Sequence, residues 1–397
     1  MVLDVAAAAV SERLYCSTEA AEAEPALVEA NNLRLCARHR RPPAANASAA
    51  LRAAFGAGPL ALRITGPVAD GFFVRALTVL AQARWARHVG LPISVAYRSP
   101  ADAYAAPGAG SRDGFSHYFE PPAAAAAVPP GARLVQLECA AAARCWEGHG
   151  SYAWDWPTAA ALRRRRVADV AALPLRPRAR FVRAADAFWR AERLDAASSV
   201  LGVHLRGTDK TKGHVPVGRY LPLVRAYLCH DATAAILVAT DDASMLAQFV
   251  AAVGAASPTT RVVWRRDASR GNGSGLGNNP AGAFGCEAKM VCAKGGGGDG
   301  GAACRQRAWP SQFDCAGGAR RRPARPAAVG EDVLVDTLLL ARAAFLLKSV
   351  SAVGEFAVYW SEGGRLLERS YDFNLEGRQP VPRWAGACGR RRPNIKS

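Results

Sequence analysis

The stretch that decides the fold spans residues 200–210 and reads VLGVHLRGTDK. Its first half is an apolar run with one glycine inside, which predicts a short buried strand. Its second half is a dense polar cluster, which predicts a turn at the carboxyl end of that strand. Open α/β sheets place ligand sites outside the carboxyl ends of their strands. A strand followed by a solvated, salt-bridged surface turn is the competing interpretation, and the stretch alone leaves both open.

The same order of strand, polar turn and helix recurs along the second half of the chain. A strand predicted at 234–240 ends in Asp241-Asp242, and one at 345–347 ends in a polar turn before a helix at 352–360. The first half opens with a strand at 60–65, an amphipathic helix at 73–89 and a strand at 93–97. Strand, helix, strand in this order predicts parallel sheets with helices on both faces.

We divide the chain by these patterns into two α/β domains, at 58–195 and 196–378. Residues 1–57 are rich in Ala, Glu and Pro and are expected to form a poorly packed lead-in. A Gly-, Arg- and Cys-rich insertion is predicted at 265–329, and a basic tail at 379–397.

The polar turns of the second domain are expected to meet, because parallel strands end at one rim. The converging residues are His204, Arg206, Asp209, Lys210, Asp241, Asp242, Ser349 and Ser351. The two serines precede a helix whose N-terminal amides suit a diphosphate, and the Arg206 guanidinium is a matching cation. We therefore predict a nucleotide diphosphate ligand. The adjacent acids could instead hold a divalent metal, but the basic cluster can neutralise phosphates alone, so we favour a metal-free site.

Charge and composition allow further interpretations. The 397 residues carry a formal net charge of +18 and are 50% hydrophobic, so the chain is globular and strongly basic. The charge is mainly Arg, in runs at 163–166, 320–325 and 390–392, without the interleaved aromatics of a base-stacking surface. Nucleic-acid binding is therefore a minor alternative, and acidic donors, glycans or membrane surfaces account for the charge equally well.

The ten cysteines favour an oxidising compartment. None form a CxxC pair, and four of them, Cys286, Cys292, Cys304 and Cys315, crowd the insertion that has little else to hold it. No signal peptide or membrane span is visible in the sequence. We expect the N-terminus to be incomplete, with a missing anchor as the route to membrane association.

Three blocks together resemble the fucosyltransferase superfamily, which includes the α-1,6-, nodulation and protein O-fucosyltransferases. They are GVHLRGTDK at 202–210, VATDD at 238–242 and EDVLVDTLLLARAAFLLKSVSAVGEFA at 331–357. The resemblance covers roughly the C-terminal half and is specific only in combination. It implies a GT-B-like fold, in which two Rossmann-like α/β domains face a central cleft, and inverting transfer from GDP-fucose without a metal or other cofactor.

The resemblance also implies individual roles. Arg206 would bind and neutralise the GDP phosphates, with Gly207 beside it in the donor site, and Ser349 and Ser351 would lie at the phosphate end. His204 and Asp336 would lie at the nucleoside, with Asp336 a candidate for the guanine edge. Asp209 and Lys210 would organise the motif turn, and Asp241 and Asp242 would support the nucleotide pocket.

Two departures from the family pattern concern catalysis. The α-1,6 enzymes carry a second Arg where this chain has Gly207, and an acidic residue where an ungapped reading places His214. An imidazole can act as the base near neutral pH. A base from the first domain, or transfer of a different sugar, is an alternative.

The sequence thus predicts a fucosyltransferase-like enzyme of the Golgi or endoplasmic reticulum lumen that acts on a glycan or glycoprotein. Its catalytic residues would be Arg206, Asp209, Lys210 and His214. The alternatives are a non-catalytic nucleotide-sugar or glycan-binding relative and, third, a basic nucleic-acid-binding protein. Fold alone does not establish activity.

Overall fold

The structure is a computed structural model. It describes residues 58–64, 72–88, 90–95, 114–120, 128–136, 155–173, 175–207, 215–268, 289–292, 304–307 and 326–388. The predicted lead-in at 1–57, most of the insertion and residues 389–397 of the basic tail lie outside these ranges.

The first half of the chain forms a small parallel sheet with the order β2-β1-β3. Its strands are β1 (Leu60–Ile64), β2 (Ile93–Val95) and β3 (Arg133–Gln136), and α5 (Phe72–His88) connects the first two. Residues Leu62 and Ile93 pair in register, so β1 and β2 form the parallel unit predicted from the sequence. The short helix α6 (Gly114–Tyr118) precedes β3.

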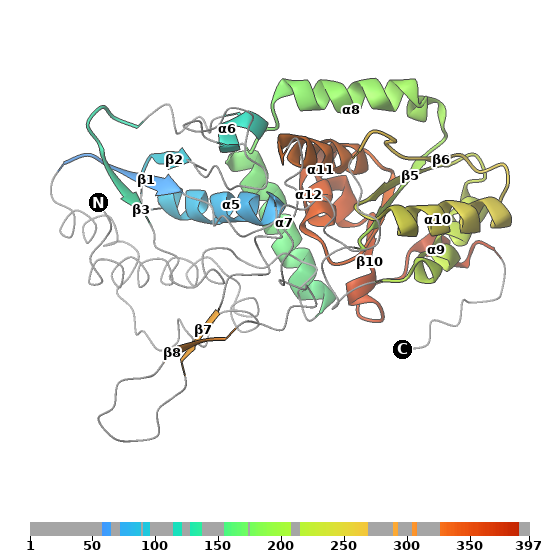
Figure 1. The fold of residues 1–397 in the computed structure, drawn as a ribbon. Coiled ribbons are helices and arrows are strands. Elements are labelled where there is room, and N and C mark those ends of the chain that lie inside the picture. Colours follow the sequence, from blue (N-terminus) through green and yellow to red (C-terminus); the bar gives the residue numbers. More distant parts are fainter. Residues whose placement is uncertain are drawn as a thin grey trace, which may run out of the picture.

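Two longer helices lead into the second half. Helix α7 (Trp156–Ala172) begins after Asp155, whose carboxylate accepts a hydrogen bond from the Thr158 amide at 2.8 Å, and Pro157 occupies the first turn. Helix α8 (Ala179–Ala191) follows and packs against α11 (Pro326–Leu340). In Figure 1, α7 runs between α5 and α12 (Ala352–Trp360), both of which it contacts.

The second half is built on a five-stranded sheet with the order β10-β9-β4-β5-β6, in which every pairing is parallel. The strands are β4 (Val200–Leu205), β5 (Ala235–Thr240), β6 (Val262–Val263), β9 (Phe345–Lys348) and β10 (Ser370–Asp372). The predicted parallel α/β organisation is therefore confirmed, with β4 at the centre of the sheet. Strand β10 was not predicted, and Lys348, assigned to a turn, is the last residue of β9.

Helices cover both faces of this sheet because alternate side chains of each strand point to opposite sides. Leu201 and Val203 of β4 pack with α9 (Val217–His230) and α10 (Ala243–Ala256) in one hydrophobic cluster. Val200 of β4 and Leu346 of β9 lie in the other cluster, with α11 and α12. His204 and Lys348 alternate in step with Val200 and Leu346, so both side chains point to the face of the sheet that α11 and α12 cover.

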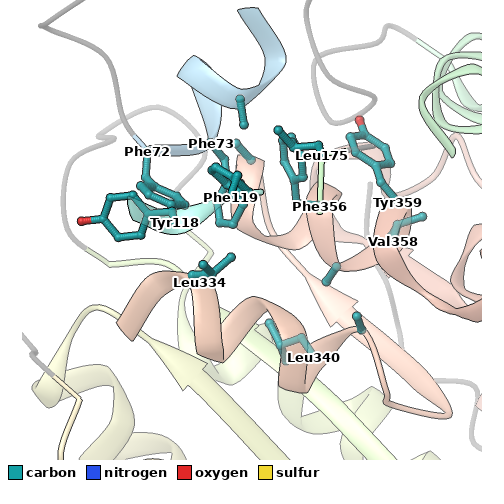
Figure 2. Close-up of a cluster of buried hydrophobic side chains, with 14 of the residues drawn as sticks. Phe72, Phe73, Tyr118, Phe119, Leu175, Leu334, Leu340, Phe356, Val358 and Tyr359 are labelled. Carbon is teal, nitrogen blue, oxygen red and sulfur yellow. The ribbon is translucent and has the colours of Figure 1, made fainter. Parts of the chain in front are cut away.

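The larger cluster joins residues from both halves of the chain. Phe73 of α5 stacks on Phe356 of α12 with ring centroids 4.5 Å apart and an interplanar angle of 26°. Figure 2 shows Phe72, Phe73 and Phe119 gathered over α12, with Leu334 of α11 below them. Aromatic contacts of this kind bury large apolar areas, so α5 and α12 are firmly packed together. The division into domains at 195–196 stays a prediction.

Among the described residues of the second half, a disulfide joins Cys229 at the end of α9 to Cys388. Within the insertion, β7 (Lys289–Cys292) and β8 (Cys304–Arg307) form an antiparallel pair with Cys292 opposite Cys304 in the backbone register. Cys286 and Cys315 lie outside the described residues. Across the part of the chain that the structure describes, we find no helix with the length and apolarity needed to cross a bilayer.

Candidate nucleotide-binding rim

The candidate site is the rim where the strands of the larger sheet end. All five strands run parallel, so their carboxyl ends lie along one edge. In sheet order, this edge has Asp372 as the last residue of β10, then Ser349 after β9, Arg206 after β4, Asp241 after β5 and Arg265 after β6. The structure thus brings together the polar turns that were expected to converge.

Arg206 and Ser351 are in direct contact at the centre of the rim. The Arg206 Nη1 atom donates a hydrogen bond of 3.0 Å to the Ser351 hydroxyl oxygen. That oxygen also accepts the Val353 amide at 3.1 Å and caps α12. Arg206 is half-buried, whereas Ser351 has no exposed surface. An anion at this rim would therefore meet Arg206 first, and Ser351 holds that side chain at the helix N-terminus.

The turn after β4 is tightly fitted to the turn after β5. The Gly207 amide donates to the Asp241 carboxylate at 3.1 Å. A Cβ atom at position 207 would lie 2.5 Å from Asp242 Oδ2 and 2.7 Å from the Met245 sulfur, closer than such atoms approach. The absence of a second Arg at this position therefore has a physical reason: this packing leaves no room for a side chain.

Asp242 serves the fold as a helix cap. Its carboxylate is buried and accepts hydrogen bonds from the amides of Ser244 at 2.8 Å and Met245 at 3.0 Å, which begins α10. Asp241 and Asp242 therefore hold the β4 and β5 turns in place. Their predicted role in supporting a nucleotide stays a prediction.

His204 lies in β4, two residues before Arg206, and is buried. Burial and the positive charges of Arg206 and Lys348 lower the pKa of His204 to about 3. Its Nδ1 atom has no hydrogen-bond partner among the described residues, while its backbone oxygen accepts the Tyr220 hydroxyl at 3.0 Å. The side chain is therefore neutral at physiological pH. A contact with the nucleoside stays a prediction.

Asp336, the candidate for a guanine edge, lies on α11 and faces Arg265. The distance between Arg265 Nη1 and Asp336 Oδ1 is 3.5 Å, and the same guanidinium pairs with Asp332 at 2.8 Å. The sequence predicts Arg265 at the start of the insertion. In the structure it follows β6 by two residues, and its ion pairs with Asp332 and Asp336 hold it at the rim. Asp336 is thus at the β6 end of the same edge as Arg206.

The structure gives little or no information on four of the predicted site residues. Asp209, Lys210 and His214 lie outside the described residues, so the motif turn and the candidate base stay predictions. Ser349 is described; it has no exposed surface, and its hydroxyl lies beside that of Tyr220.

Sequence reasoning missed a buried ionic cluster behind the rim. Its four charged members are Arg163 of α7, Lys348 of β9, Glu355 of α12 and Asp372 of β10, and none has any exposed surface. Arg163 belongs to the run at 163–166, which was interpreted as basic surface. Arg166 of the same run is also buried and pairs with Asp169 at 3.1 Å. Half of this run therefore contributes no exposed positive charge.

The chain is similar to several solved structures. No protein-family model matches it, and no curated protein sequence matches it. Fucosyltransferase NodZ from Bradyrhizobium is similar at 13% identity with a TM-score of 0.37. NodZ alpha-1,6-fucosyltransferase is similar when co-crystallised with GDP, at 13% identity and a TM-score of 0.36, and when soaked with GDP-fucose, at 14% and 0.36. Each match covers 76% of this chain and 92% of the NodZ chain.

These structures are fucosyltransferases, the family that the three sequence blocks resemble. At such identities and TM-scores the similarity does not decide what this chain binds or does. The residues of the rim carry the functional argument.

Proposed function

We propose that this chain is a glycosyltransferase that binds the diphosphate of a nucleotide sugar at the rim of its larger sheet. The observation that carries the proposal is the hydrogen bond between Arg206 and Ser351. It sets the guanidinium of the half-buried Arg206 against the N-terminus of α12, where backbone amides and the helix dipole favour negative charge. A planar guanidinium is also well suited to a diphosphate.

Within that class, we propose a fucosyltransferase that takes fucose from GDP-fucose and inverts the anomeric centre without a metal. The order and spacing of the blocks at 202–210, 238–242 and 331–357 support this choice of donor. A glycan or glycoprotein hydroxyl would be the acceptor. The Cys229–Cys388 disulfide favours the lumen of the Golgi or endoplasmic reticulum as the place of action.

The proposed reaction is a direct displacement. A base, for which His214 is the candidate, removes the proton of the acceptor hydroxyl as that oxygen attacks the anomeric carbon. The bond from this carbon to the diphosphate oxygen breaks, and GDP leaves with the bonding electron pair. Arg206 and the amides at the start of α12 stabilise the charge that develops on the diphosphate.

A non-catalytic nucleotide-sugar-binding protein is the second candidate. The packing around Gly207 favours it, because the rim cannot hold the second Arg that the α-1,6 enzymes have. Such a protein would bind the nucleotide sugar without transferring the sugar.

Two measurements test the proposal. Calorimetric titration with GDP, UDP, ADP and a DNA duplex should give binding of GDP in preference to the others. Radiolabelled GDP-fucose, incubated with the protein and a panel of glycoprotein acceptors, should then give labelled acceptor. Binding without label transfer or donor hydrolysis would support the second candidate, and preferential DNA binding would contradict both.

A further inference from the structure

The buried ionic cluster is balanced in charge and closely bonded. Glu355 Oε1 accepts from Lys348 Nζ at 2.7 Å and from Arg163 Nη2 at 2.7 Å. Asp372 Oδ2 accepts from the same two groups at 2.6 and 2.7 Å. The Tyr359 hydroxyl donates to Glu355 Oε2 at 3.0 Å. Two cations face two carboxylates, so the formal charges cancel and each charge depends on the others for its place in the interior.

The cluster lies immediately behind the contact between Arg206 and Ser351. Lys348 ends β9 in register with His204 of β4, and the chain then passes through Ser349 to Ser351. Glu355 is one helical turn beyond Ser351, and its amide donates to the Ser351 carbonyl at 3.1 Å. The ammonium of Lys348 therefore ties the strand that precedes Ser351 to the helical turn that follows it.

The aliphatic stem of Lys348 fits a space that only glycine leaves open. A Cβ atom at position 354 would lie 2.9 Å from Lys348 Cδ and 3.1 Å from Lys348 Cβ. Lys348 thus passes against the first turn of α12 on its way to Glu355. Any shift of this stem would move the turn that Ser351 caps.

We propose that Lys348 is a positioning residue for the diphosphate site. Its buried ammonium fixes the first turn of α12 through Glu355, and so holds Ser351 and the Arg206 guanidinium in the geometry that receives phosphate. This inference rests on the proposed function, in which a nucleotide diphosphate binds beside Arg206. Arg163 contacts the same carboxylates from α7, but it does not join β9 to the first turn of α12.

Charge-balanced double variants separate the two cations. Lys348→Met with Glu355→Gln removes the bond across the α12 turn and leaves Arg163 paired with Asp372. Arg163→Met with Asp372→Asn is the matched control, which leaves Lys348 paired with Glu355. We expect the first pair to weaken GDP binding at least about tenfold and the control to keep it within about threefold, because small displacements of a binding group have large effects. Equal GDP affinity in the two doubles would contradict the inference.

Gly354→Ala tests the same idea without touching any charge, and decides it if either double variant fails to fold. The new Cβ displaces the Lys348 stem, whereas Gly254→Ala on α10, with nothing within 4 Å, is the control. We expect Gly354→Ala to raise the Kd for GDP severalfold relative to Gly254→Ala, with the Kd for guanosine the same in both variants.

The outcomes distinguish the two proposals. If the unaltered protein binds no GDP, the proposed function fails and the inference fails with it. If the unaltered protein binds GDP and Gly354→Ala binds it equally well, the inference alone is wrong. Parallel losses of GDP and guanosine binding in Gly354→Ala would also contradict it, because a general structural defect would not act through the phosphates.

Discussion

Arg206 and Ser351 are hydrogen-bonded at 3.0 Å although 145 residues separate them in the sequence. The bond joins the end of the central strand β4 to the cap of α12. A cation and a helix N-terminus thereby form one unit at the rim, and each supports the binding of an anion.

Ser351→Ala should destabilise the protein by about 0.5–2 kcal/mol, because the Val353 amide and the Arg206 guanidinium both lose their acceptor. Urea unfolding followed by circular dichroism measures the change. Gln248→Ala is the control, since this exposed side chain in the middle of α10 should change stability by no more than about 0.5 kcal/mol. Equal effects of the two substitutions would show that Ser351 is not an important cap.

Gly207→Ala should destabilise the protein by about 1–3 kcal/mol, because its Cβ would lie 2.6 Å from Asp242 Cβ and the β5 turn would have to move. Gly218→Ala in α9 has open space around it and should be neutral or stabilising by up to about 1 kcal/mol. Thermal unfolding of both variants checks the pair. A neutral Gly207→Ala would mean that the rim can accept a side chain there.

The stability of the protein should fall as the pH is lowered from about 6.5 toward 3, and His204 should be one cause. Burial, with Arg206 and Lys348, lowers the His204 pKa to about 3 in the folded state, against about 6.5 when unfolded. The unfolded chain therefore binds the extra proton first, and His204 contributes up to about 1.4 kcal/mol per pH unit across this window.

The measurement is the free energy of unfolding as a function of pH. His204→Gln should flatten the dependence of the unfolding free energy on pH between these values, whereas Gln248→Ala, which alters an exposed side chain of α10 without an ionisable group, should leave that dependence as in the unaltered protein. An unchanged slope in His204→Gln would mean that the histidine is not held neutral by the fold.

Loss of the Cys229–Cys388 bond should lower stability by about 2–5 kcal/mol, because the bond closes a long loop between α9 and the end of the described chain. Differential scanning calorimetry of the Cys229→Ser/Cys388→Ser double variant gives the value. A Tm equal to that of the parent under non-reducing conditions would count against the bond and remove one support for an oxidising compartment.

The elements of the larger sheet could be predicted from local patterns. The helix at 352–360 is observed with the predicted bounds, and β4 and β5 follow the apolar runs that ended in polar turns. Strand β10 could not be predicted, because Ser370-Tyr371-Asp372 has no apolar run and is a strand only through its pairing with β9. The local sequence does not indicate which distant strand a segment will pair with.

The meeting of the polar turns could also be predicted, because it follows from parallel strand order alone. The roles within the site could not. Asp242 looks like a ligand-binding acid in the sequence and is a helix cap in the structure. Arg163 looks like part of a basic surface, yet its partners Glu355 and Asp372 lie 192 and 209 residues away. Burial and long-range pairing decide these roles, and neither is visible in residue type or spacing.

The most direct test of the account compares the dissociation constants of GDP and guanosine for the unaltered protein and for Arg206→Ala. The account predicts that the unaltered protein binds GDP far more tightly than guanosine. In Arg206→Ala the ratio of the guanosine Kd to the GDP Kd should fall by at least about tenfold, while the Kd for guanosine stays the same. The reason is that a charge-assisted contact of this kind contributes about 1.5–3 kcal/mol. Equal affinity for GDP and guanosine in the unaltered protein, or an Arg206→Ala protein that keeps the full preference for GDP, would contradict the claim that this rim binds a diphosphate.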